Sequence, residues 1–246
     1  MIEQTFVFIA LCFLLAGFIK GVLGLGLPTV SMGLLALAMP PAQAAALLIV
    51  PSLVTNVWQM LVGPDLARIV RRLWSMMAGV CIGTWAGAGL LTGTDVRLVS
   101  AGLGLCLVLY AALGFASVRW TVRPSTRIWQ SPLMGAITGL IGAATGTFVI
   151  PGVPYLQAIG LQKEELVQAL GLSFTVSTFA LAGNLAHAGV FNWTVGLTSL
   201  GALIPALVGM YVGQVTRGHL QERAFRLVFL LGLLALGAYL LLRALA

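Results

Sequence analysis

The chain has 246 residues, of which 60% are hydrophobic and only 8% are charged, and its mean hydropathy is +1.06. Soluble domains carry about 25% charged residues, so this composition excludes a soluble globular protein and indicates an all-α polytopic membrane protein. The net charge of +7 would suggest nucleic acid as the partner of a soluble protein. Here the arginines lie in short loops, which is typical of membrane orientation, and no nucleic-acid partner is expected.

Six segments are apolar and long enough to cross a bilayer, which takes about 20 residues in a helix. They are 42–62, 73–92, 98–118, 166–188, 193–215 and 224–244. Two further regions, 5–40 and 131–161, are apolar but broken, at GVLGLGLP and at GLIGAATGTFVIPGVP. The first residues, MIEQTF, lack the positive stretch of a cleaved signal peptide, so we expect the first apolar region to remain in the protein.

The two broken regions resemble each other, and each is followed by three unbroken spans. Glycines recur at a constant offset of 118 residues: Gly17, Gly21 and Gly24 in the first region, and Gly135, Gly139 and Gly142 in the second. Farther along, ALLIVPSLVTN at 46–56 lies opposite ALGLSFTVSTF at 169–179. We therefore predict two repeats, 1–118 and 131–246, joined by a basic linker, 119–130, with about eight to ten membrane segments in all.

The orientation follows from the arginines, which concentrate in cytoplasmic loops of membrane proteins. They form three clusters: Arg68, Arg71 and Arg72; Arg119, Arg123 and Arg127; and Arg217, Arg223 and Arg226. The loops 93–97 and 189–192 carry no net positive charge and should face outward. The loop after the first unbroken span is then cytoplasmic in one repeat and external in the other. This predicts inverted repeats with both termini external, if each broken region is a hairpin. The membrane expected is the cytoplasmic (inner) membrane of a bacterium.

A broken helix at membrane depth must be buried in protein or line a wet cavity, because its backbone amides would otherwise lack partners. Inverted hairpins would bring their tips together near the midplane, and the N-termini of the short helices that follow favour an anion. Charge does not decide whether the hairpins cross fully or reach only mid-depth. The alternative for Gly17-xxx-Gly21 and Gly135-xxx-Gly139 is close helix packing through small residues.

Lys20 is the most basic point at the first break, and a lysine inside a membrane is costly unless it is paired or hydrated. It either helps to hold an anion or extends toward the membrane surface. Ser52, Thr55, Asn56 and Gln59 lie on one face of a helix, by their i, i+3, i+4, i+7 spacing. The alternative for these and the other polar residues is hydrogen bonding between helices. The predicted substrate-binding residues are Lys20, Gly21, Gly24, Gly26, Pro28, Thr29, Ser52, Thr55, Asn56, Gln59, Gly142, Thr145, Gly146, Thr147, Pro151, Ser173 and Ser177.

The remaining titratable residues suggest no catalytic chemistry. The acids Glu3, Asp65, Asp95, Glu164, Glu165 and Glu222 all lie near span ends or in loops. No cluster has metal-ligand spacing, no phosphate-binding loop is present, and neither an enzyme activity nor a cofactor or metal is expected. His187 ends its span and is a candidate gate or proton-carrying residue.

At these residues the chain resembles the sulfite exporter TauE/SafE family, also called the toluene sulfonate uptake permease family. The features are GFIKGVLGLGLPTVSMGLL and AALLIVPSLVTNVWQ in the first repeat, and GAITGLIGAATGTFVIPGVPYLQAIGL with QALGLSFTVSTF in the second. The resemblance covers nearly the whole chain. It implies a transporter of small sulfur-containing anions such as sulfite, sulfonates or sulfoacetate, surrounded by membrane lipids.

The resulting hypothesis is a secondary transporter or facilitator that binds the anion between the two hairpins and works by alternating access. Export is favoured, because an anion leaving a negative interior gains about 2.3 kcal/mol per charge per 100 mV, whereas import would require coupling. The alternatives are a transporter of another small solute, such as an amino acid or a metal cation, and an intramembrane enzyme or assembly protein without transport activity. Whether the protein forms a homo-oligomer stays open.

Overall fold

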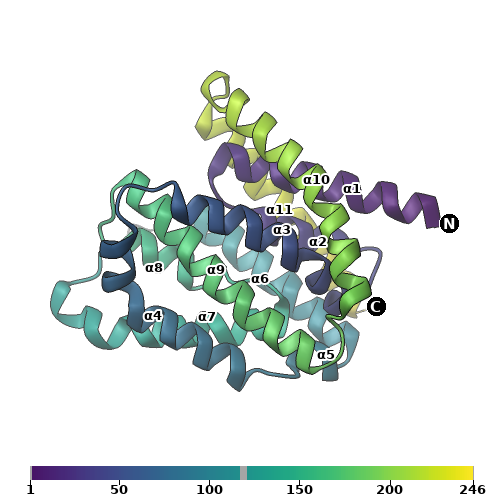
Figure 1. Ribbon diagram of the computed structural model, residues 1–246, viewed down its shortest axis with the longest axis horizontal. Helices are drawn as coiled ribbons and strands as arrows, with labels where there is room; N and C mark the ends of the chain where they lie inside the picture. Colours follow the sequence, from purple (N-terminus) through teal and green to yellow (C-terminus); the bar gives the residue numbers. More distant parts are fainter. Residues whose placement is uncertain (1, 117–120, 246) are drawn as a thin grey trace.

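The computed structural model describes residues 2–116 and 121–245, and this part of the chain is helical, without a strand (Figure 1). Arg119 of the second arginine cluster, and with it the start of the predicted linker, lies outside the described residues. The α-helices are α1 (Ile2–Leu23), α2 (Leu27–Leu35), α3 (Pro41–Leu61), α4 (Leu66–Ala86), α5 (Leu90–Gly93), α6 (Val96–Ala116), α7 (Arg127–Thr145), α8 (Gly152–Ala158), α9 (Lys163–His187), α10 (Trp193–Thr216) and α11 (Glu222–Leu245). Two short 3₁₀ turns, Pro124–Thr126 and Arg217–His219, precede α7 and α11.

Seven of the described helices are long and apolar enough to cross a membrane: α1, α3, α4, α6, α9, α10 and α11. They include all six unbroken spans that the sequence predicts, with boundaries shifted by a few residues. The largest shift is in α4, which begins at Leu66, where Asp65 caps the helix by accepting a hydrogen bond from the backbone N–H of Arg68. The all-α membrane fold predicted from hydropathy is thus confirmed.

Both broken regions form a long helix, a non-helical break and a short helix. The first break, 24–26, contains Gly24 at φ +75° and Gly26 at φ +110°, left-handed conformations that side chains other than glycine rarely adopt. The second break, 146–151, begins at Gly146, which also has a positive φ. The short helices α2 and α8 extend for only about 14 Å and about 11 Å, roughly half the hydrocarbon thickness or less.

The breaks are narrower than the sequence indicates. Gly21 belongs to α1 and Gly142 to α7, so neither glycine interrupts its helix. A glycine in an apolar run can mark a break or a close contact, and here both serve contacts. Gly21 lies against the backbone of α10, and Gly142 lies under the ring of Phe148.

The interior of the protein is centred on α2, which is buried along almost its whole length. Met32 and Leu35 of α2 are fully buried, together with Phe13 of α1 and Leu107 of α6. The first hairpin therefore folds back into the protein and keeps its short arm away from lipid, as backbone close to a break requires.

Glycines allow α1 to pack in close backbone contact with α10. A Cβ atom built at Gly17 would lie 2.2 Å from the carbonyl oxygen of Ala206, and one at Gly21 would lie 2.3 Å from that of Met210. On α10, a Cβ atom built at Gly209 would lie 2.0 Å from the carbonyl oxygen of Leu14 in α1. The contact continues toward higher residue numbers on both helices, so α1 and α10 run parallel.

The pair α4 and α7 packs in the same way. Cβ atoms built at Gly135 and Gly139 of α7 would lie 2.1 Å and 2.2 Å from the carbonyl oxygens of Met76 and Val80 of α4. These glycines are the ones that match Gly17 and Gly21 in sequence. On the partner helix, Gly79 and Gly83 of α4 lie 130 residues before Gly209 and Gly213 of α10, and all four glycines face carbonyl oxygens of the neighbouring helix.

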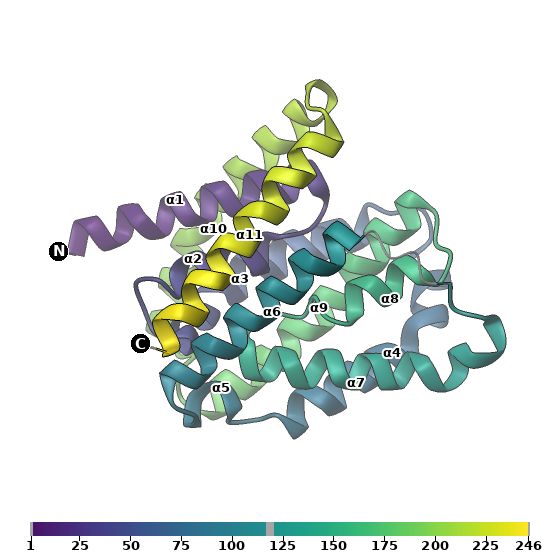
Figure 2. The same cartoon turned by 180° about the vertical axis from the view of Figure 1, so that it is seen from behind.

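Two further helix pairs, α3 with α9 and α6 with α11, run antiparallel. Gly63, just after α3, lies against Gln168 of α9, whereas Gly171 of α9 lies against Asn56 of α3, so residue numbers rise on one helix as they fall on the other. In α6 and α11, Gly104 lies against Gly237 and Gly114 against Leu230, again in opposite order. Figure 2 shows α6 and α11 next to each other.

The glycine contacts predict a sharp difference between two glycines of α10. Gly209→Ala should lower stability by about 1–3 kcal/mol, because the new methyl group must separate α10 from α1. Gly201 lies in the same helix but has no atom within 4 Å of a built Cβ, so Gly201→Ala should leave stability unchanged or raise it by up to about 1 kcal/mol. The thermal unfolding midpoint of each variant in detergent measures this, and equal midpoints would contradict the close contact.

Candidate functional site

Lys20 lies in the last turn of α1, directly before the first break, and only 4% of its surface is exposed. Its ammonium group donates hydrogen bonds to the hydroxyl oxygen of Thr55, at 3.1 Å, and to the side-chain carbonyl oxygen of Asn56. Both partners belong to α3. The lysine therefore points into the protein, rather than extending toward the membrane surface.

Both partners of Lys20 are neutral. The ion pairs among the side chains that the structure describes join Arg68 to Asp65 and Glu165, and Lys163 to Glu222; none includes Lys20. A buried cation without a counter-charge loses its hydration without a compensating Coulomb attraction. A negative charge beside Lys20 would supply the Coulomb attraction that its neutral partners do not provide.

A cavity of about 450 Å³ reaches Lys20. Five of the predicted site residues line it: Lys20, Gly21, Gly24, Thr55 and Gln59. Four exposed polar residues also line it, Lys163 and Glu164 at the start of α9, and Gln214 and Arg217 at the end of α10. The cavity thus lies at the end of the molecule that carries Arg217 of the third arginine cluster.

Gln59 holds the first break in position. Its side-chain amide donates to the carbonyl oxygen of Gly24 at 2.9 Å and to that of Val167 in α9 at 2.8 Å. The residue four positions after Gly24 is Pro28, which has no N–H to donate to this carbonyl. Gln59 thus ties together the break, α3 and α9 at the wall of the cavity.

Several buried polar atoms of α2, α3 and α9 have no hydrogen-bond partner among the residues that the structure describes. They are the hydroxyl oxygens of Thr29, Ser31, Ser52 and Ser177 and the amide nitrogen of Asn56, in residues that are at most 1% exposed. Thr29, Ser52, Asn56 and Ser177 are predicted site residues. Ser31 is an addition; its place two residues after Thr29 on a short helix that follows a break was the available signal.

The predicted residues of the second hairpin lie elsewhere. The hydroxyl groups of Thr145 and Thr147 are 3.0 Å apart, and that of Thr147 lies 3.4 Å from the thiol of Cys106 in α6. A Cβ atom at Gly146 would lie 2.6 Å from the tip of Met32 in α2. This buried cluster packs against the first hairpin's short arm and does not line the cavity at Lys20.

The other predicted residues lie in four places. Gly26, Pro28 and Thr29 surround the start of α2, and Ser173 is buried within α9. Gly142 and Pro151 flank the second break, and His187 ends α9 at an exposed position. None of these residues belongs to the described lining of the Lys20 cavity. The sequence, in turn, did not indicate Trp58, Lys163, Glu164, Gln214 or Arg217, which do.

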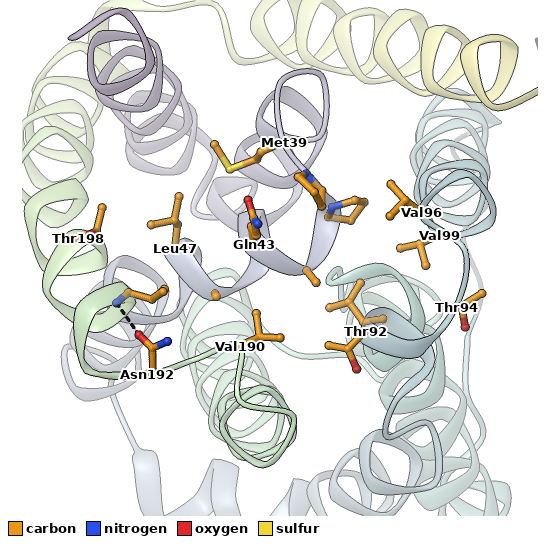
Figure 3. Close-up of a pocket in the computed structure, with 16 residues that line it drawn as sticks. Met39, Gln43, Leu47, Thr92, Thr94, Val96, Val99, Val190, Asn192 and Thr198 are labelled. Carbon is orange, nitrogen blue, oxygen red and sulfur yellow. Dashed lines mark hydrogen bonds between the residues drawn. The ribbon is translucent and has the colours of Figure 1, made fainter. Parts of the chain in front are cut away.

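A second cavity, of about 550 Å³, opens beside the loops 93–97 and 189–192 (Figure 3). Its described lining is neutral and includes Gln43, Thr92, Thr94 and Thr198. Asn192, at its rim, accepts a hydrogen bond from the backbone N–H of Val195 and so caps α10. The two cavities thus lie at opposite ends of α3, and one is cationic whereas the other is uncharged.

Comparison with known proteins connects this architecture to a family. Searches of curated proteins and of solved structures found no match to the chain. The family model for "Sulfite exporter TauE/SafE" matches residues 9–240, which include both breaks, both cavities and all or most of each long helix. A match over this length, on a chain with seven membrane-length helices, shows that the protein is a member of the TauE/SafE family.

Proposed function

We propose that the protein is a membrane transporter of small sulfur-containing anions, such as sulfite and sulfonates, and that Lys20 is its principal anion contact. The observation that carries the proposal is the buried Lys20 ammonium group, which has neutral partners only and lines a cavity. The family described as a sulfite exporter supports the class of substrate.

The residues around Lys20 suggest how an anion would be held. The ammonium group supplies the charge and has three N–H donors. Thr55 and Asn56 accept hydrogen bonds from it, and a sulfonate or sulfite oxygen would accept another. The unpartnered amide N–H of Asn56 and the hydroxyl of Ser52, one helical turn earlier on the same face, offer further donors. Exposed Lys163 and Arg217 at the cavity mouth would attract anions from that side.

The transport mechanism we infer rests on two inverted repeats, 1–118 and 131–246, with 119–130 as their linker. By their matching glycines, α1 of the first repeat corresponds to α7 of the second, and α4 corresponds to α10. The parallel pair of α1 with α10 is therefore equivalent to the parallel pair of α7 with α4. The helices that correspond to each other, α3 with α9 and α6 with α11, run antiparallel. Helices that are related by duplication and run in opposite directions are those of inverted halves.

Inverted halves provide two similar arrangements of one protein, which is the basis of alternating access. The cavity at Lys20 and the neutral cavity at Gln43 lie at opposite ends of α3 and suggest the two access paths. Rocking of one half against the other would close the path from one cavity to the bound anion and open the path from the other cavity. The proposal places both termini outside a bacterial cytoplasmic membrane and favours export, since the membrane potential drives an anion out of the cell.

The role of Lys20 predicts the outcome of charge removal. Lys20→Met should reduce flux of methanesulfonate in proteoliposomes under an imposed potential by about tenfold to about a hundredfold, the loss typical of a hydrogen-bonded charge. Lys20→Arg should retain part of the flux because it retains the charge. Arg123→Met is the control; it removes an exposed cation outside the cavity and should transport as the unaltered protein does. Normal flux in Lys20→Met, at equal protein content, would overturn the proposal.

The inverted orientation predicts which side reaches each loop. In a protein whose Cys12, Cys81 and Cys106 have been replaced by alanine, Arg71→Cys should react with an impermeant maleimide only after the cells are permeabilised. Ala188→Cys, at the exposed end of α9, should react on intact cells. The reason is that α3 and α9 end on opposite sides if the halves are inverted. Labelling of both positions from the same side would exclude inversion.

A further inference from the structure

The charges around Lys20 bear on which anions the site can accept. Lys20 is the single charged side chain among the buried residues that the structure describes. Its hydrogen-bond partners on α3, Thr55 and Asn56, are neutral and fully buried. Among the described residues, Lys20 is therefore the one ionisable side chain at the interior end of the cavity.

The other charged groups that face the cavity lie at its mouth. Lys163 and Glu164 come from α9 and Arg217 follows α10, and all three are exposed to solvent. The ammonium nitrogen of Lys163 also lies 3.8 Å from a carboxylate oxygen of Glu222, and both side chains are exposed. Water screens charges at such positions, so they steer ions toward the cavity but contribute little to the balance at Lys20.

From this arrangement we infer that the protein carries singly charged anions and rejects doubly charged ones of the same size. The inference rests on the proposed function. One negative charge beside Lys20 leaves the occupied interior neutral, whereas two leave an excess negative charge in a low-dielectric region. The hydroxyl and amide groups of Ser52, Thr55 and Asn56 can stabilise anion oxygens but cannot neutralise a second full charge.

The rule ranks the sulfur anions. Hydrogen sulfite and simple sulfonates carry one charge and fit the site. Fully deprotonated sulfite, sulfate and sulfoacetate carry two and do not. The hydroxyl group of Thr55, which lines the cavity, suits the protonated oxygen of hydrogen sulfite in particular, because a hydroxyl oxygen can accept the hydrogen bond that such an oxygen donates.

A matched pair of sulfonates tests the rule in the unaltered protein. Sulfoacetate and sulfoacetamide have nearly the same shape, but the amide removes one negative charge. In proteoliposomes at neutral pH, without an imposed potential, and with external and internal anion exchanged one for one, sulfoacetamide should exchange at least about tenfold faster than sulfoacetate. Methanesulfonate, small and singly charged, is the reference substrate.

The outcomes separate the two proposals. Rapid exchange of methanesulfonate and sulfoacetamide with slow exchange of sulfoacetate supports the charge rule. Equal rates for sulfoacetate and sulfoacetamide overturn the rule and leave the proposed function intact. Exchange of no sulfonate and no sulfite overturns the proposed function, and the rule with it.

Sulfite gives an independent measurement, because it loses its second proton near neutral pH. The ratio of sulfite flux to methanesulfonate flux should fall as the pH is raised through neutrality, in proportion to the remaining hydrogen sulfite. Methanesulfonate keeps one charge throughout, so the ratio cancels effects of pH on the protein itself. A constant ratio would contradict the rule.

Discussion

The buried charge of Lys20 is the constraint on which the proposed site depends. A lysine at this depth requires neutral hydrogen-bond acceptors, water or an anion, and the chain supplies acceptors from α3 and a cavity in front of them. Replacing either acceptor by a carboxylate would stabilise the lysine and remove its attraction for an anion. Because its partners on α3 are neutral, the charge of Lys20 stays available to bind an anion in the proposed site.

Close helix contacts hold this site in place. The glycines of α1 let it approach α10 to backbone distance, and those of α7 do the same with α4, so the long arm of each hairpin packs against a helix of the other proposed repeat. In the proposed rocking of one repeat against the other, Lys20 in the last turn of α1 would follow α10 and so move relative to its partners Thr55 and Asn56 in α3. Packing and binding are thus mechanically connected through one short segment.

Hydropathy was sufficient to predict the long helices, because a bilayer imposes length and apolarity on each span separately. The shared face of Thr55, Asn56 and Gln59 was also predictable, since helical spacing is local. The contact of Lys20 with that face joins residues 35 positions apart and rests on tertiary packing. For the same reason the sequence alone did not show that Thr145 and Thr147 pack against Cys106, outside the Lys20 cavity. Gly21 and Gly142 appeared to be breaks because one sequence does not distinguish a glycine that bends a helix from one that admits a neighbour.

Chemical restoration of the charge tests the central claim most directly. Lys20→Cys should be inactive in sulfonate flux, and treatment with 2-aminoethyl methanethiosulfonate, which attaches a side chain ending in an ammonium group, should restore flux. Methyl methanethiosulfonate, which attaches a neutral group, should not; the unaltered protein, treated in the same way, controls for Cys12, Cys81 and Cys106. Restoration by the cationic reagent alone is the result that the account predicts. Equal flux after both reagents, or full flux before either, would contradict it.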